Sequence, residues 1–112
     1  KLDIWDTAGQ PEQQALARNF YSGSHAVIIV YSVDSPNTFK SGTATSKTFK
    51  ASATLECAQV LVGNKCDLDE DRRISFDDMC DKAQDNEIKA FETSALPDRK
   101  STIDELFSEV IL

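Results

Sequence analysis

Three short polar clusters in the sequence contain residues that could do chemistry. They are Asp6-Thr7-Ala8-Gly9-Gln10, Asn64-Lys65-Cys66-Asp67 and Glu92-Thr93-Ser94-Ala95-Leu96. Each cluster follows a short stretch whose polarity pattern predicts a strand, at 1–5, 60–63 and 88–91. Open α/β sheets bind their ligands at the carboxyl ends of the strands, so the three clusters are expected to line one edge of one sheet.

Asp67, after the second of these strands, suits recognition of a guanine base. A carboxylate can accept two hydrogen bonds from guanine, one from the ring N–H and one from the exocyclic amine. Adenine presents an acceptor where guanine presents the ring donor, and a site built to pair a polar group rejects a partner that lacks it by about 10⁴–10⁵. A polar strand end that merely turns the chain is the alternative, and a single N-K-x-D motif does not decide between the two.

The order and spacing of D-T-A-G-Q, N-K-C-D and E-T-S-A-L resemble those of the Ras-like small GTPases, over nearly all of the 112 residues. The resemblance implies an α/β fold, a P-loop NTPase-like G domain with a doubly wound, mostly parallel sheet. It implies GTP, GDP and Mg²⁺ as ligands, and GTP hydrolysis by the full-length protein. Its partners would be effectors, exchange factors and GTPase-activating proteins.

The same resemblance assigns the reacting end of the nucleotide to the first cluster. Asp6 would hold Mg²⁺ through a water, the Gly9 backbone N–H would meet the γ-phosphate, and Gln10 would orient the attacking water. Positioning and charge stabilisation would carry the reaction, with little covalent chemistry asked of the protein.

The other two clusters would bind the base. By the resemblance, Asn64 would brace the nucleotide-binding loops and the Lys65 stem would cover the flat face of the base. Asp67 would read guanine with Ser94 bracing it, and the Ala95 backbone N–H would meet the guanine carbonyl.

A phosphate-binding loop, G-x-x-x-x-G-K-[ST], is not found, because none of Gly9, Gly23, Gly42 and Gly63 is followed by Lys. The family's metal-binding Thr, which precedes the D-T-A-G-Q strand, is also not found. We therefore expect residues 1–112 to be the C-terminal two-thirds of a single G domain, missing its first two strands and first helix. Little nucleotide affinity is expected from this part alone.

Composition indicates one soluble domain, with 40% hydrophobic and 28% charged residues. The net charge of −7 argues against a surface for nucleic acid or anionic membrane. The three cysteines form no C-x-x-C pair and no zinc spacing, which fits a reducing cytoplasm. By the resemblance, the full-length protein would sit on the cytosolic face of membranes, through a C-terminal lipid tail that these residues do not include.

Strands and helices are predicted to alternate along the chain. A continuous apolar strand is expected at 25–31, and Ser35 with Pro36 favours a helix start. That helix is the weakest expectation, because its small and β-branched residues form helices poorly and offer little apolar face. Two further helices start at Ser75 and Ser101. Their core-facing residues would be Phe76, Met79, Cys80 and Ala83, and then Ile103, Leu106, Phe107, Val110 and Ile111. Residues 69–73 are expected to be a solvated loop.

Within the family, K-L-D-I-W before D-T-A-G-Q looks most like the Rab branch, which works in vesicle traffic. Trp5 and Phe20 would either form the surface that faces effectors or close the core beneath it. Pro11 departs from the Rab pattern; it restricts Gln10, or else starts the following helix. A Ras or Rho assignment stays open on these residues.

Two other interpretations of the sequence, each from a different class of protein, remain open. The first is a non-catalytic interaction module with a GTPase-like fold, which the missing phosphate loop favours and the presence of Gln10 and Asp67 disfavours. The second is a flavodoxin-like or receiver domain, which shares the doubly wound sheet but leaves the three motifs unexplained.

Overall fold

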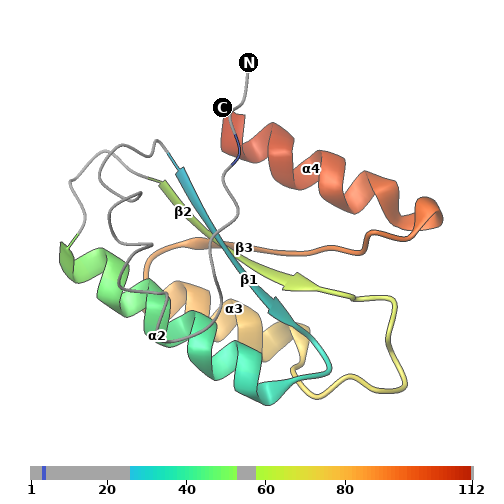
Figure 1. Cartoon of the computed structure of the whole chain (residues 1–112), viewed down its shortest axis with the longest axis horizontal. Coiled ribbons are helices and arrows are strands. Elements are labelled where there is room, and N and C mark those ends of the chain that lie inside the picture. Colours follow the sequence, from blue (N-terminus) through green and yellow to red (C-terminus); the bar gives the residue numbers. More distant parts are fainter. Residues whose placement is uncertain (1–3, 5–25, 53–57, 112) are drawn as a thin grey trace.

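The structure is a computed structural model that describes Ile4, residues 26–52 and residues 58–111. Its elements follow one another along the chain in alternation (Figure 1). They are β1 (Ala26–Ser32), α2 (Pro36–Ser52), β2 (Ala58–Asn64), α3 (Phe76–Asp85), β3 (Lys89–Glu92), the 3₁₀ helix η1 (Pro97–Arg99) and α4 (Lys100–Ile111). The strand expected at 1–5 lies outside the described residues, apart from Ile4.

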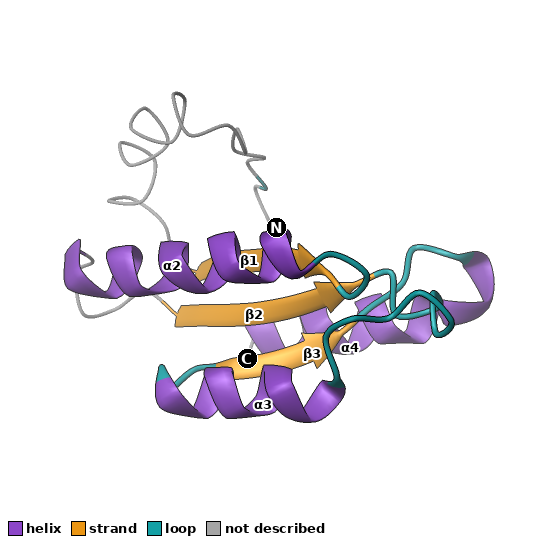
Figure 2. Cartoon of the chain, turned by 90° about the horizontal axis from the view of Figure 1, so that it is seen from below, coloured by secondary structure: helices purple, strands orange, loops and turns teal. Residues whose placement is uncertain are grey.

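The three strands form a parallel sheet in the order β1-β2-β3. Val30 pairs with Val62, and Val62 pairs with Phe91, so all three carboxyl ends reach the same edge. Helices α2 and α3 cover one face and α4 covers the other (Figures 1 and 2). The predicted α/β fold with a parallel, doubly wound sheet is therefore confirmed in the described part of the chain.

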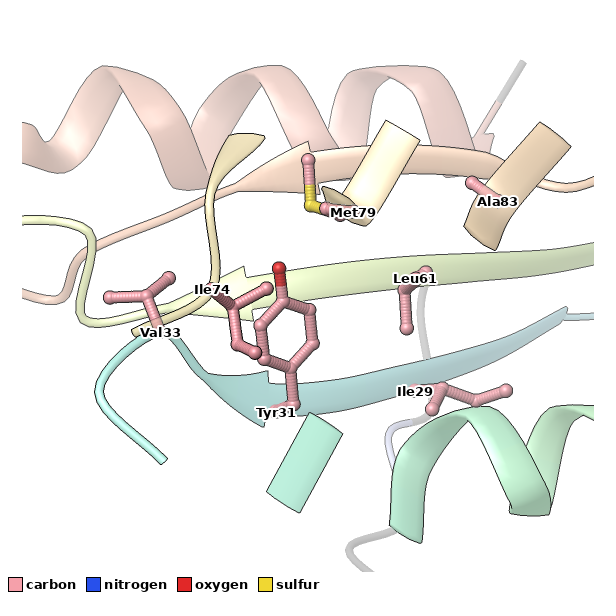
Figure 3. Packing of buried hydrophobic residues seen from close by; sticks show 7 residues of the cluster. All are labelled: Ile29, Tyr31, Val33, Leu61, Ile74, Met79 and Ala83. Atoms are coloured by element: carbon pink, nitrogen blue, oxygen red, sulfur yellow. The ribbon is translucent and has the colours of Figure 1, made fainter. Parts of the chain in front are cut away.

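The main core lies between the sheet and the α2–α3 layer (Figure 3). Leu61 and Met79 are fully buried there, and the Tyr31 ring meets Phe39 edge to face with 4.8 Å between ring centroids. On the other face, Leu106 of α4 packs against Val60 and Val62. Because β2 is covered on both faces, it needs the continuous apolar run that predicted it.

Helix α2 forms over 17 residues despite its poor helix formers. Small residues let it lie close to the sheet: a Cβ added at Gly42 would be 3.3 Å from Ile29 Cγ2. The buried polar groups find partners, since Thr43 Oγ1 donates to the Phe39 carbonyl at 3.0 Å and Ser46 Oγ donates to Gln59 Oε1 at 2.8 Å. Close packing of these small residues against the sheet stabilises the helix, although it has neither a bulky apolar face nor high intrinsic helix propensity.

Helix α3 begins as predicted, with Ser75 at its N-cap accepting the Asp78 N–H at 3.0 Å. Met79 and Ala83 are buried, but the Phe76 side chain is 54% exposed, so its predicted core role is wrong. Phe76 is the first residue of α3, outside the core that the sheet and the helices enclose. Helix α4 starts at Lys100, one residue before the predicted start.

Candidate functional site

The second and third motifs meet at the carboxyl edge of the sheet. Asn64 ends β2 and Glu92 ends β3, and Gly63 pairs with Glu92 in the parallel register. The first motif, with Asp6, Gly9 and Gln10, lies outside the described residues, as do Trp5, Pro11 and Phe20.

Asp67 and Ser94 are hydrogen-bonded across this edge. Ser94 Oγ donates to Asp67 Oδ1 at 2.6 Å, the contact that the family resemblance implied. Ser94 is fully buried and its backbone N–H donates to Thr102 Oγ1 at 3.1 Å, which holds the serine in place. Asp67 Oδ2 makes no hydrogen bond to any other described residue, so one carboxylate oxygen is held by the protein and the other is open.

Asn64 and Thr93 join the same two loops one step deeper. Thr93 Oγ1 donates to Asn64 Oδ1 at 3.0 Å. The Thr93 backbone accepts the Cys66 N–H at 3.0 Å and donates its own N–H to the Gly63 carbonyl at 2.9 Å. These bonds extend the β2–β3 pairing past the end of the sheet and bring the loops that follow the strands together.

Lys65 is exposed and adopts a left-handed backbone conformation, with φ of 60°. For a residue with a Cβ this costs on the order of 1–2 kcal/mol, offset by the turn that it opens. In that turn the Leu68 N–H donates to the Lys65 carbonyl at 2.9 Å, and Asp67 lies within it. Ala95 is also exposed, so the two residues expected to touch a base face solvent beside Asp67.

An ion pair that sequence reasoning missed joins the loop after β2 to the end of β3. Arg72 Nη1 and Nη2 donate to Glu92 Oε2 and Oε1 at 2.5 and 3.1 Å. Residues 69, 70, 71 and 73 are exposed as expected, but the Arg72 side chain is only 22% exposed, so the solvated-loop prediction is wrong for that residue. An acid at the end of a buried strand needs a cationic partner, and Glu92 was the available signal.

Cys66, inside the second motif, is buried with 7% of its surface exposed. Burial, followed by the negative charge of Glu92, raises the pKa of its thiol. The thiolate is the reactive form of cysteine. Burial limits access to this sulfur and the raised pKa keeps it protonated, so both disfavour its reaction.

We therefore expect iodoacetamide to alkylate Cys66 at least about tenfold more slowly in the native protein at pH 7.5 than in the unfolded chain. If Cys66 reacts only after a local opening of the native protein, an opening free energy of about 1.4 kcal/mol is enough to slow alkylation tenfold. Site-resolved mass spectrometry measures the rate, and the guanidinium-unfolded chain serves as its own control. Equal alkylation rates at Cys66 in the native and unfolded protein would contradict the burial of this side chain.

Within residues 26–52 and 58–111 and at Ile4, no three His, Cys, Asp or Glu side chains group in a way that could hold a metal ion. The residue expected to hold Mg²⁺, Asp6, is outside the described part. Among the described helices, none is long and apolar enough to cross a membrane.

Comparison with known proteins agrees with the motifs. A family model described as "Ras family" matches residues 1–112. GTP-binding protein YPT1 of Saccharomyces cerevisiae is 40% identical over 96 residues, covering 86% of this chain and 47% of that protein. Human Ras-related protein Rab-4B is 38% identical over 96 residues (86% of this chain, 45% of that protein), and dog Rab-13 is 33% identical over 111 residues (98% and 53%). The chain spans about half the length of these curated relatives. It belongs to the Ras family of small GTPases, in the Rab branch.

Proposed function

We propose that the protein is a GTP/GDP switch that hydrolyses GTP and binds the guanine base at the edge where β2 and β3 end. The observation that carries this proposal is the held carboxylate of Asp67. Ser94 fixes one of its oxygens at 2.6 Å, and the group lies at the sheet edge where α/β proteins take their ligands. A fixed acceptor beside an open oxygen suits the two neighbouring donors of guanine.

The surrounding residues supply the rest of a base site. In this proposal the backbone N–H of the exposed residue Ala95 donates to the guanine carbonyl, and the Lys65 stem lies over the ring. Asn64 acts through Thr93, which ties the two loops together at 3.0 Å. Such a site is largely formed before the ligand arrives, which reduces the cost of ordering it.

For the phosphate end we propose the roles that the family resemblance assigns to the first motif. Asp6 holds Mg²⁺ through a water, Gly9 offers its backbone N–H to the γ-phosphate, and Gln10 orients the attacking water. When bound, Mg²⁺ supplies positive charge against the phosphates. Pro11 restricts the backbone of Gln10, so the hydrolysis rate is expected to depend on this pair.

The similarity to Rab proteins supports a proposal for the cellular role. We propose that the switch acts in vesicle traffic, through effectors, exchange factors and GTPase-activating proteins that distinguish its two nucleotide states. The full-length protein would work in the cytoplasm and at the cytosolic face of membranes, held there by a lipid tail.

The test is competition for a fluorescent GDP analogue on the full-length protein with Mg²⁺. We expect GDP to displace the analogue at a concentration at least about 1,000-fold lower than ADP does, since adenine lacks the ring donor that Asp67 pairs. Single-turnover hydrolysis of GTP then tests the catalytic half. A folded protein that binds neither nucleotide would contradict the proposal and favour a non-catalytic interaction module.

A further inference from the structure

The two loops that carry Asp67 and Ser94 are also joined by the Arg72–Glu92 ion pair. Arg72 lies in the loop between β2 and α3 that contains Asp67, and Glu92 lies two residues before Ser94. The guanidinium meets both carboxylate oxygens, at 2.5 and 3.1 Å. Two parallel bonds of this kind fix orientation as well as distance.

Stability alone is a poor explanation for this pair. Both side chains are largely buried, with 22% and 17% exposed, so desolvation offsets much of their attraction. What the forked geometry contributes is a defined position, which a lysine could not supply. Arg72 Nη1 also donates to the Ile74 carbonyl at 3.1 Å, so the guanidinium is held against the backbone of its own loop.

The position of Asp67 depends on how this loop is held. Its middle, at Asp69, Glu70 and Asp71, is exposed. The loop is anchored at its start by the Cys66 N–H on the Thr93 carbonyl, and at its end by the Arg73 N–H on the Val33 carbonyl. Within the described residues, the Arg72 side chain is the ion-pair link from this loop to the end of β3.

We infer that Arg72 is a positioning residue for guanine recognition. Its ion pair with Glu92 holds the Asp67 loop against the Ser94 loop, at the spacing that lets Asp67 accept both guanine donors. This inference rests on the proposed function. Arg72 contacts no base in it and acts through Glu92 and the loop.

The test compares GDP with IDP, whose base lacks the exocyclic amine, on the full-length protein. The ratio of their dissociation constants reports how well Asp67 is placed, and a merely structural loss would leave it unchanged. Displacements on the ångström scale reduce the function of a positioned group steeply, so Arg72→Ala is expected to weaken GDP binding about tenfold and to lower the IDP-to-GDP ratio at least about threefold. Arg72→Lys should lower the ratio less than Arg72→Ala does but by more than about twofold, because a lysine cannot make the forked pair with Glu92.

The matched control is Lys89→Ala. It breaks the Lys89–Glu109 ion pair, which joins the other end of β3 to α4, away from the motifs. This variant should keep the wild-type ratio. If wild type does not prefer GDP to ADP, the proposed function and this inference both fail. If wild type does prefer GDP and folded Arg72→Ala keeps a ratio within about twofold of wild type, only the inference is overturned. Should Arg72→Ala fail to fold, Arg72→Lys decides by the same criterion.

Discussion

Asp67→Asn is expected to weaken GDP binding by at least about 100-fold and to shift preference toward xanthosine diphosphate. Hydrogen bonds to a charged group contribute about 1.5–3 kcal/mol each, and the substitution removes the charge from both bonds to guanine. It also places an amide N–H₂ donor opposite one of the guanine donors. Xanthine carries a carbonyl in place of the exocyclic amine, so the same N–H₂ group gains an acceptor there.

The fold should survive this substitution. Ser94 Oγ donates to Oδ1 of Asp67, and an asparagine oxygen can accept the same bond. The thermal unfolding midpoint of the variant is therefore expected to lie close to that of wild type, so loss of GDP binding would report recognition rather than unfolding. Competition against a fluorescent GDP analogue gives both dissociation constants.

Asp69→Asn is the matched control for the same chemical change. Asp69 is exposed in the same loop, and its carboxylate lies 3.9 Å from the Arg72 guanidinium, too far for a hydrogen bond. Its effect on GDP affinity should stay within about threefold, as for an exposed ion pair. Equal losses in the two variants would show that net loop charge, rather than Asp67, governs affinity.

Sequence patterns predicted the parts of this fold that depend on local chemistry. The apolar run in β2 is visible because both faces of a central parallel strand are buried. Ser75 is recognisable as an N-cap because its hydroxyl oxygen can accept a hydrogen bond from an unpaired N–H in the first turn of the helix, here that of Asp78. The meeting of the second and third motifs at one edge follows from the parallel register, which places the two strand ends side by side.

Features that depend on distant partners could not be predicted in this way. Helix propensity undervalued α2 because its small residues act through contact with β1, which no local window contains. Arg72 pairs with a residue 20 positions further along the chain. The Ser94–Asp67 bond was expected from the family resemblance and not from spacing. The helical period wrongly predicted a core role for Phe76. The period identifies which face of a helix is apolar, but not how far along the helix the core extends.

Gly63, immediately before Asn64, should tolerate no side chain. A Cβ there would lie 2.6 Å from the Tyr31 hydroxyl oxygen, 2.8 Å from Tyr31 Cζ and 3.3 Å from Val33 Cγ1. Tyr31 and Val33 are 1% and 0% exposed, so neither has space to move into. Alanine in place of glycine in a strand would otherwise be favourable by about 0.5–1 kcal/mol, so the close contact decides the sign.

We therefore expect Gly63→Ala to lower the free energy of unfolding by about 2–3 kcal/mol, measured by urea unfolding of the full-length protein. Gly42→Ala is the matched control: its Cβ would meet Ile29 Cγ2 at 3.3 Å, and better helix propensity offsets the contact, so the change should stay within about 1 kcal/mol. A Gly63→Ala protein as stable as wild type would contradict the packing described for this strand.

Tyr31→Phe separates the two close contacts at Gly63. It removes the hydroxyl, which has no hydrogen-bond partner among the described residues and whose burial raises the pKa of Tyr31. The hydroxyl therefore stays protonated, a buried donor without an acceptor, and its loss alone should cost little. Combined with Gly63→Ala, it removes the 2.6 Å contact and leaves the ring carbon at 2.8 Å, so the double variant should recover about half of the lost stability. No recovery would place the strain at the ring or at Val33, and full recovery would place it at the hydroxyl alone.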